Sequence, residues 1–550
     1  MNFRYRKLIW IVAILVIWAF DFMLHQGEPG ISLTIAIVLS LIGGLLLAYI
    51  EEKKPAWTSY LLIPLILFFA VMLSVRREAG TSFTNLFLSV GGMAILAVTL
   101  VGGKWLRYSL TDYVVKFFSL AFGGLTNGAV LAFRKKESPE GVEESSEPAP
   151  AAAASGWKTI GVPVLRGLLI AIPVIALLAA LLASADPIFS KGLENLLDLF
   201  RLEKLGEYLF RAVYILIFGY VLAGVYIQAL VKSEDEKLIG VEKHWLPAVL
   251  GIVEAVVILG LVDLLFATFV GVQFRYFFGG QANISLEGYT YAEYARRGFG
   301  ELLAVSIISL LLFLGLSSIT RRETRAQRLL FGGLGIALVA LVIVMLVSAF
   351  QRLVLYETAY GFSAMRTYTH IFMIWLGLLL FATIVLEIIQ RQRAFALMAV
   401  IAAVGFGITL NLINVEAFIV RQNVALAESG VMLEPQSSSG MEEMQTSRYP
   451  LDMQYLNTLS SDAVPEMVAA FQRPNLSTHS KERLGAVLAC KAAAYEDLTY
   501  QPAWVSFHLS QSRAVESLRQ VVEQLPTLEP GEYGEVQVQG DSFYCYDILR

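Results

Sequence analysis

A pair of arginines with neighbouring tyrosines and acids is the part of this sequence best suited to binding an anion. Tyr294, Arg296 and Arg297 lie in the stretch 290–301, and Glu357 and Tyr360 lie in the stretch 351–366. A guanidinium donates hydrogen bonds in a rigid planar fork that matches a phosphate or a carboxylate. The two stretches therefore predict a site for a small anionic or lipid-like ligand. Lipid headgroup contact and pairing with Glu293 or Glu301 are the structural alternative.

Two acidic residues fall inside an apolar run. Glu254 and Asp263 both lie in the run 246–273, and an ionisable residue within a membrane span costs about 2.5–3.5 kcal/mol on insertion scales. Their spacing places them on opposite faces of a helix, so they do not form a paired acid and base. Each is either part of a proton or cation relay or a protonated carboxyl that is hydrogen-bonded to a neighbouring helix. The sequence leaves their protonation open.

Both cysteines of the chain, Cys490 and Cys545, fall near its end. A disulfide between them and two free buried thiols are both compatible with the sequence, because sequence alone does not bring two Cα atoms together. The chain lacks a phosphate-binding loop, an H-E-x-x-H motif, a C-x-x-C pair and a nucleophile elbow. The sequence therefore predicts no catalytic residue, no metal site and no cofactor, and a non-enzymatic protein is favoured over an enzyme.

The composition shows which elements must position these residues. Of 550 residues 56% are hydrophobic and 16% are charged, with a mean hydropathy of +0.63, which is typical of a membrane protein rather than of a nucleic-acid partner. We expect an all-α integral membrane bundle of about eleven transmembrane helices in the lipid bilayer. The predicted spans are 8–24, 31–50, 57–75, 83–103, 160–183, 207–231, 246–273, 300–319, 328–350, 368–389 and 394–413.

Basic residues predict the orientation of this bundle. With Arg4, Arg6 and Lys7 inside, the alternating loops place most basic clusters inside as well, as the positive-inside rule requires. Arg76 and Arg77 are the exception, which we interpret as snorkelling at a helix end. An odd number of spans then places the chain after residue 413 on the outer side of the membrane.

The chain divides into four regions. Residues 1–134 form a four-helix unit with an interfacial segment at 105–133, 135–158 form a disordered cytoplasmic linker, and 159–413 form a seven-helix unit with an interfacial helix at 188–204. Residues 414–550 form a small, mostly helical extracytoplasmic domain with helical patterns at 451–459, 463–472, 480–495 and 504–525. Alternation around Gly540–Ser542 predicts that this domain ends in a β-hairpin.

Several polar segments resemble those of a known bacterial family. They are Ser184–Phe189, Tyr291–Phe299, Leu355–Phe362 and Leu412–Phe418, followed by Leu451-Asp452 and Tyr455-Leu456. Together they look like the polytopic membrane family catalogued as domain of unknown function 4173. The resemblance implies a multi-pass protein of the bacterial inner membrane and implies no activity.

Three functions are compatible with this reading. The leading one is non-enzymatic transport or envelope sensing, with the ligand near the outer face. The second is a membrane enzyme acting on a lipid-linked substrate, with Glu357 or Glu293 as general base. The third is a structural partner that positions another envelope protein through residues 414–550.

Overall fold

A computed structural model describes most of the chain, namely residues 6–133, 205–234, 238, 249–278, 299–429, 451–495, 503–527, 535–538 and 541–545. Within these ranges ten helices are long and apolar enough to cross a membrane. The chain is thus a multi-pass membrane protein. The predicted linker 135–158, span 160–183 and interfacial helix 188–204 lie outside the described residues.

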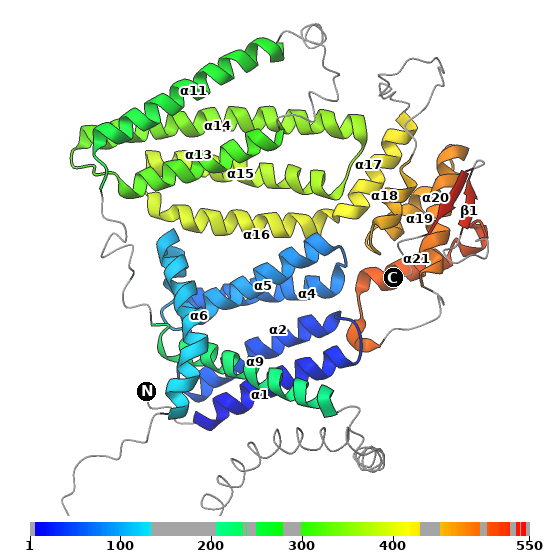
Figure 1. Ribbon diagram of the computed structural model, residues 1–550, viewed down its shortest axis with the longest axis horizontal. Helices are drawn as coiled ribbons and strands as arrows, with labels where there is room; N and C mark the ends of the chain where they lie inside the picture. Colours follow the sequence, from blue (N-terminus) through cyan, green and yellow to red (C-terminus); the bar gives the residue numbers. More distant parts are fainter. Residues whose placement is uncertain are drawn as a thin grey trace, which may run out of the picture.

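The first group of helices packs around its own apolar core (Figure 1). Its elements are α1 (Arg6–His25), α2 (Ile31–Ile50), α3 (Trp57–Tyr60), α4 (Leu62–Val75), α5 (Ala79–Thr99), η1 (Lys104–Arg107), α6 (Leu110–Phe133) and α9 (Leu205–Val231). Figure 1 shows α6 running across the direction of the spans, at the bundle end that carries η1. This is the arrangement expected of a helix that lies at a membrane surface.

The second group forms a separate core beside the first. Its elements are α11 (Ile252–Phe278), α13 (Phe299–Ile319), α14 (Arg325–Tyr360), α15 (Ala364–Ile388), η5 (Gln392–Ala394) and α16 (Phe395–Ile413). Consecutive helices alternate in direction, and α16 packs on α5 of the first group. The two groups of helices therefore lie side by side and span the same membrane.

The C-terminal domain lies against one end of both groups (Figure 1). It contains α17 (Val415–Ser429), α18 (Met453–Thr458), α19 (Val464–Phe471), α20 (Thr478–Ala493), η6 (Trp504–Ser506), α21 (Leu509–Arg519), η7 (Val522–Gln524), β1 (Glu535–Val538) and β2 (Asp541–Tyr544). The strands pair antiparallel, with Val538 opposite Asp541. Asp541 and Ser542, which were predicted to lie in a turn, therefore lie in β2.

A single apolar cluster joins this domain to the membrane helices. Ile371 of α15 and Leu410 of α16 belong to the same buried cluster as Val468 and Leu488 of the C-terminal domain. Burying the apolar side chains of this cluster favours docking by roughly 25 cal/mol for each Å² of apolar surface that is removed from water. The domain is thus packed onto the bundle rather than tethered to it.

Several predicted boundaries are wrong. Helix α5 begins at Ala79 rather than 83 and ends at Thr99, and α14 continues to Tyr360. Helix α17 has no counterpart in the predicted pattern, and the predicted helix 504–525 is interrupted on both sides of α21. Asn414 adopts a left-handed conformation with φ 50°, which ends α16 and allows the chain to turn into α17.

Candidate functional site

Asp462 of the C-terminal domain holds the connection between α4 and α5. Its carboxylate accepts hydrogen bonds from the backbone N–H groups of Arg77 at 2.6 Å and Glu78 at 2.8 Å. The Arg76 guanidinium lies 3.4 Å from the same carboxylate, whose side chain is 1% exposed. A buried carboxylate with two amide donors and a guanidinium is a charge-assisted contact. Asp462 therefore fixes a loop between two spans to the domain outside the bundle.

Arg76 extends this contact into the membrane helices. One guanidinium nitrogen donates at 2.5 Å to the carbonyl of Asn411, which α16 leaves free at its C-terminus. The amides of Asn411 and Asn85 then pair with each other between α16 and α5, at 2.6 and 3.1 Å. Arg76 is thus a partner of both Asp462 and the bundle, and not a snorkelling residue.

Glu78 fixes the start of α5. Its side chain accepts from the backbone N–H groups of Gly80 at 2.9 Å and Thr81 at 2.6 Å, which makes it the N-cap of the helix. The hydroxyl of Tyr368 in α15 donates to the same carboxylate. The first turn of α5 is therefore tied to the second group of helices.

A second buried carboxylate, Glu416, faces the same junction. It accepts from the Ser460 N–H at 2.9 Å and from the Ser460 hydroxyl at 2.5 Å. Burial raises the pKa of Glu416 to about 7, although the Ser460 hydrogen bonds act in the opposite direction; the charges of Asp462 and Glu78 raise it further. Glu416 therefore titrates in a range where most glutamates stay ionised.

Lys491 is a buried cation of the C-terminal domain. Its ammonium donates to the carbonyls of Asn457 and Leu459, each at 2.5 Å, at the end of α18. Burial lowers the pKa of Lys491 to about 8, and the nearby charge of Glu416 raises it. A lysine placed at helix carbonyls satisfies acceptors that would otherwise be unpaired.

A cavity of about 380 Å³ opens at this junction between the bundle and the domain. Arg76, Arg421 and Arg513 line it together with Asp462 and Glu466. Arg421 pairs with Glu466 at 3.1 Å. Arg513 is exposed and has no side-chain partner among the described residues. The cavity combines three guanidiniums with two carboxylates, so an anion would have to compete for Arg76 and Arg421 but not for Arg513.

Of the five predicted ligand-binding residues, the structure describes Glu357 and Tyr360. Tyr294, Arg296 and Arg297 lie outside the described residues. Glu357 is 1% exposed, and one carboxylate oxygen lies 3.0 Å from His370 Nδ1. The Tyr360 ring stacks edge-on at 4.9 Å from Tyr356, and the Arg366 guanidinium covers the Tyr356 ring at 4.1 Å. Glu357 thus contacts α15 through His370, and the backbone carbonyl of Tyr360 accepts from Arg366 of α15 at 3.2 Å.

The two predicted intramembrane acids are not equivalent. Helix α11 begins at Ile252, so Glu254 lies exposed in its first turn, within the candidate span Ile252–Gln273. An intramembrane position of Glu254 stays a prediction. Asp263 lies mid-helix, and its two carboxylate oxygens are buried with no hydrogen-bond partner among the described residues. Within these residues no group of His, Cys, Asp and Glu side chains could hold a metal ion.

The two cysteines are bonded in the structure. Cys490 of α20 and Cys545 after β2 form a disulfide, with Cα atoms 5.4 Å apart, a separation typical of such bonds. Both residues are buried in the core of the C-terminal domain. The bond therefore links the final strands to the helical part of the domain.

Fold and junction define a polytopic helical membrane protein with a docked C-terminal domain. Residues 62–470 match the model of a domain of unknown function, DUF4153, and this match covers most of the chain. The chain therefore belongs to the DUF4153 family, and the resemblance to domain of unknown function 4173 was wrong. No curated protein and no solved structure matches the chain.

Proposed function

We propose that this DUF4153 protein is a non-enzymatic envelope sensor of the bacterial cell membrane. In this proposal a small anion enters the junction cavity and changes how the C-terminal domain holds the bundle. The observation that carries it is the dual role of Arg76, which both lines the cavity and pairs with Asp462. An anion that recruits Arg76 must weaken its pairing with Asp462, so occupancy and docking are linked.

The distribution of charge supports an outer position for this cavity. Basic residues gather at the opposite end of the bundle, in the connections around η1, η5 and the start of α14. By the positive-inside rule that end faces the cytoplasm, and the N-terminus lies with it. The C-terminal domain and its disulfide then lie outside, where disulfides persist.

The predicted site residues Tyr294, Arg296 and Arg297 enter this proposal through their place in the sequence. Phe299 at the start of α13 stacks 6.3 Å from Tyr356 near the end of α14. The connection that carries Tyr294, Arg296 and Arg297 precedes Phe299 directly. We keep these residues in the proposal as a second contact for the anion.

The alternatives have less support. Glu357 is buried against His370 and does not line the junction cavity, which does not favour it as a general base on a lipid-linked substrate. A transporter would use the same cavity, and uptake of phosphate into proteoliposomes would distinguish it from a sensor. A scaffold would retain another envelope protein through residues 414–550 whether or not phosphate is bound.

Substituting Arg513 tests the proposal. In right-side-out vesicles from cells expressing the protein, inorganic phosphate added outside should bind the wild type and bind Arg513→Gln about tenfold more weakly, because a charge-assisted contact is lost. Arg325→Gln at the far end is the matched control. An impermeant maleimide on Glu516→Cys identifies the outer side. Equal affinities for Arg513→Gln and Arg325→Gln, or a maleimide reaction only after permeabilisation, would contradict the proposal.

A further inference from the structure

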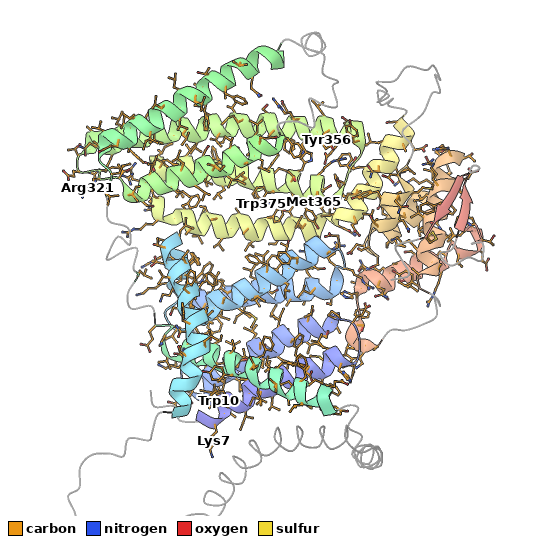
Figure 2. The ribbon with its side chains drawn as sticks, in the orientation of Figure 1. Lys7, Trp10, Arg321, Tyr356, Met365 and Trp375 are labelled. Atoms are coloured by element: carbon orange, nitrogen blue, oxygen red, sulfur yellow. A yellow bond between two sulfur atoms is a disulfide. The ribbon has the colours of Figure 1, made fainter. Side chains whose placement is uncertain are left out.

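Six arginines surround one cavity at the end of the bundle opposite to the C-terminal domain. The cavity has a volume of about 930 Å³ and none of its fourteen described lining residues is acidic. Figure 2 labels one of the six, Arg321, at this end. The six are Arg107, Arg321, Arg322, Arg328, Arg391 and Arg393. A cavity of this charge attracts anions strongly.

The arginines come from three connections that are distant in sequence. Arg107 ends η1, Arg321 and Arg322 join α13 to α14, and Arg393 lies in η5. Elements η1 and η5 contact each other. Leu106 packs on the core of the first helix group, and Ala394 packs on the core of the second. The cavity therefore lies at the seam between the two groups of helices.

A hydrogen-bonded network shapes one wall of the cavity. Buried Glu387 accepts from the Gln392 side chain at 2.5 Å, and the amide oxygen of Gln392 accepts from the Ser317 hydroxyl at 2.9 Å. Arg322 donates to the Ser317 carbonyl at 2.6 Å and stacks over Phe331 at 4.6 Å. Arg322 is thus held in place, and the negative charge of Glu387 partly balances the charge of Arg322.

The charges of four other arginines of the cavity are not paired with an acidic side chain within the described residues. Arg107, Arg328, Arg391 and Arg393 make no side-chain hydrogen bond or ion pair within the described part of the chain. The positive-inside rule explains why basic residues occur on this side. It does not explain why three separate connections bring them to one cavity, where like charges repel each other. A bound anion would remove that repulsion.

We propose that this cavity binds a phosphate-bearing anion, which holds the two groups of helices together at the cytoplasmic end. Several guanidinium forks match the oxygens of a phosphate group. The phosphate could belong to the headgroup of an anionic phospholipid, which basic pockets between helices on this side bind, or to a soluble phosphate compound. This site is independent of the sensing function proposed above.

Binding by purified full-length protein in nanodiscs tests the site. One arm measures retention of phosphatidylglycerol, by native mass spectrometry, in nanodiscs that otherwise contain phosphatidylcholine. The other arm measures pyrophosphate binding, by calorimetry, in nanodiscs of phosphatidylcholine alone. We expect Arg391→Gln with Arg393→Gln to weaken binding about tenfold or more in one of the arms. Arg325→Gln, which removes an exposed arginine outside the cavity, should stay within about twofold of the wild type.

Each outcome has one meaning. A loss confined to the phosphatidylglycerol arm identifies a lipid headgroup, and a loss in the pyrophosphate arm identifies a soluble anion. Equal binding by the double variant and by Arg325→Gln in both arms would overturn the proposal. If the double Gln variant does not insert, Arg391→Lys with Arg393→Lys keeps the charge that directs insertion but loses the planar forks. Wild-type binding by that variant in both arms would also overturn it.

Discussion

Asp462→Ala is expected to loosen the C-terminal domain from the helix bundle, at a cost of about 3–5 kcal/mol. The substitution leaves the Arg76 guanidinium without its buried carboxylate. It also leaves the backbone N–H groups of Arg77 and Glu78 without their acceptor, and an unsatisfied buried donor costs about 1–3 kcal/mol. Urea unfolding of the purified protein in detergent should show a lower midpoint for loss of the domain.

Glu466→Gln is the matched control for Asp462→Ala. Glu466 pairs with Arg421 and Arg473, both of which are largely exposed, at 3.1 and 3.3 Å. Exposed pairs contribute about 0–1 kcal/mol, so this variant should unfold close to the wild type. Similar midpoints for Asp462→Ala and Glu466→Gln would show that the apolar cluster alone docks the domain.

Stability of the junction is expected to fall as pH rises from about 5 to about 7, because of Glu416. Its pKa of about 7 in the folded protein lies above the ordinary value of 4.5. Between these values the folded state binds more protons than the unfolded state, so the free energy of unfolding decreases with rising pH. The loss is at most about 3 kcal/mol, since each unit of pKa corresponds to about 1.4 kcal/mol.

Lys491 sets the upper end of the pH range in which the stability of the junction falls. Its pKa of about 8 in the folded protein lies below the ordinary 10.5. Between these values the unfolded state binds more protons than the folded state, so the free energy of unfolding rises with pH above about pH 8. Asp462 and Glu78 also face Glu416 and keep its pKa high. The midpoint temperature of thermal unfolding should therefore pass through a minimum between about pH 7 and 8. Glu416→Gln should remove the acidic slope, whereas exposed Glu516→Gln should keep it, and a flat wild-type profile would refute this assignment.

Hydropathy was sufficient to locate the ten described spans but not their ends. The predicted start of α5 at 83 missed a polar first turn, in which Glu78 caps the helix and the Thr84 hydroxyl donates to the Gly80 carbonyl. Such side chains satisfy backbone groups within the helix, so a polar segment can continue a span. In α14, Glu357 extends the helix beyond its apolar run because His370 of α15 pairs with it. Local hydrophobicity contains neither signal.

The junction site depended on contacts between residues far apart in sequence. Arg76 and Arg77 were visible as exceptions to the positive-inside rule, and that exception was the one signal that pointed to them. Their partners Asp462 and Gln511 lie 386 and 434 residues further along the chain. A surface carboxylate and a buried one look alike in a sequence. The pairing follows from the docking of the C-terminal domain, which the sequence alone does not position.

Hydrogen exchange in the α4–α5 connection tests the sensing proposal most directly. The purified protein would be compared with and without inorganic phosphate by mass spectrometry. The exchange of the Arg77 and Glu78 amides would be followed, because both donate hydrogen bonds to the Asp462 carboxylate. The proposal predicts faster exchange at this connection when phosphate is bound, and about tenfold more phosphate to reach the same effect in Arg513→Gln. Unchanged exchange in the wild type at saturating phosphate would contradict the link between the cavity and the docked domain.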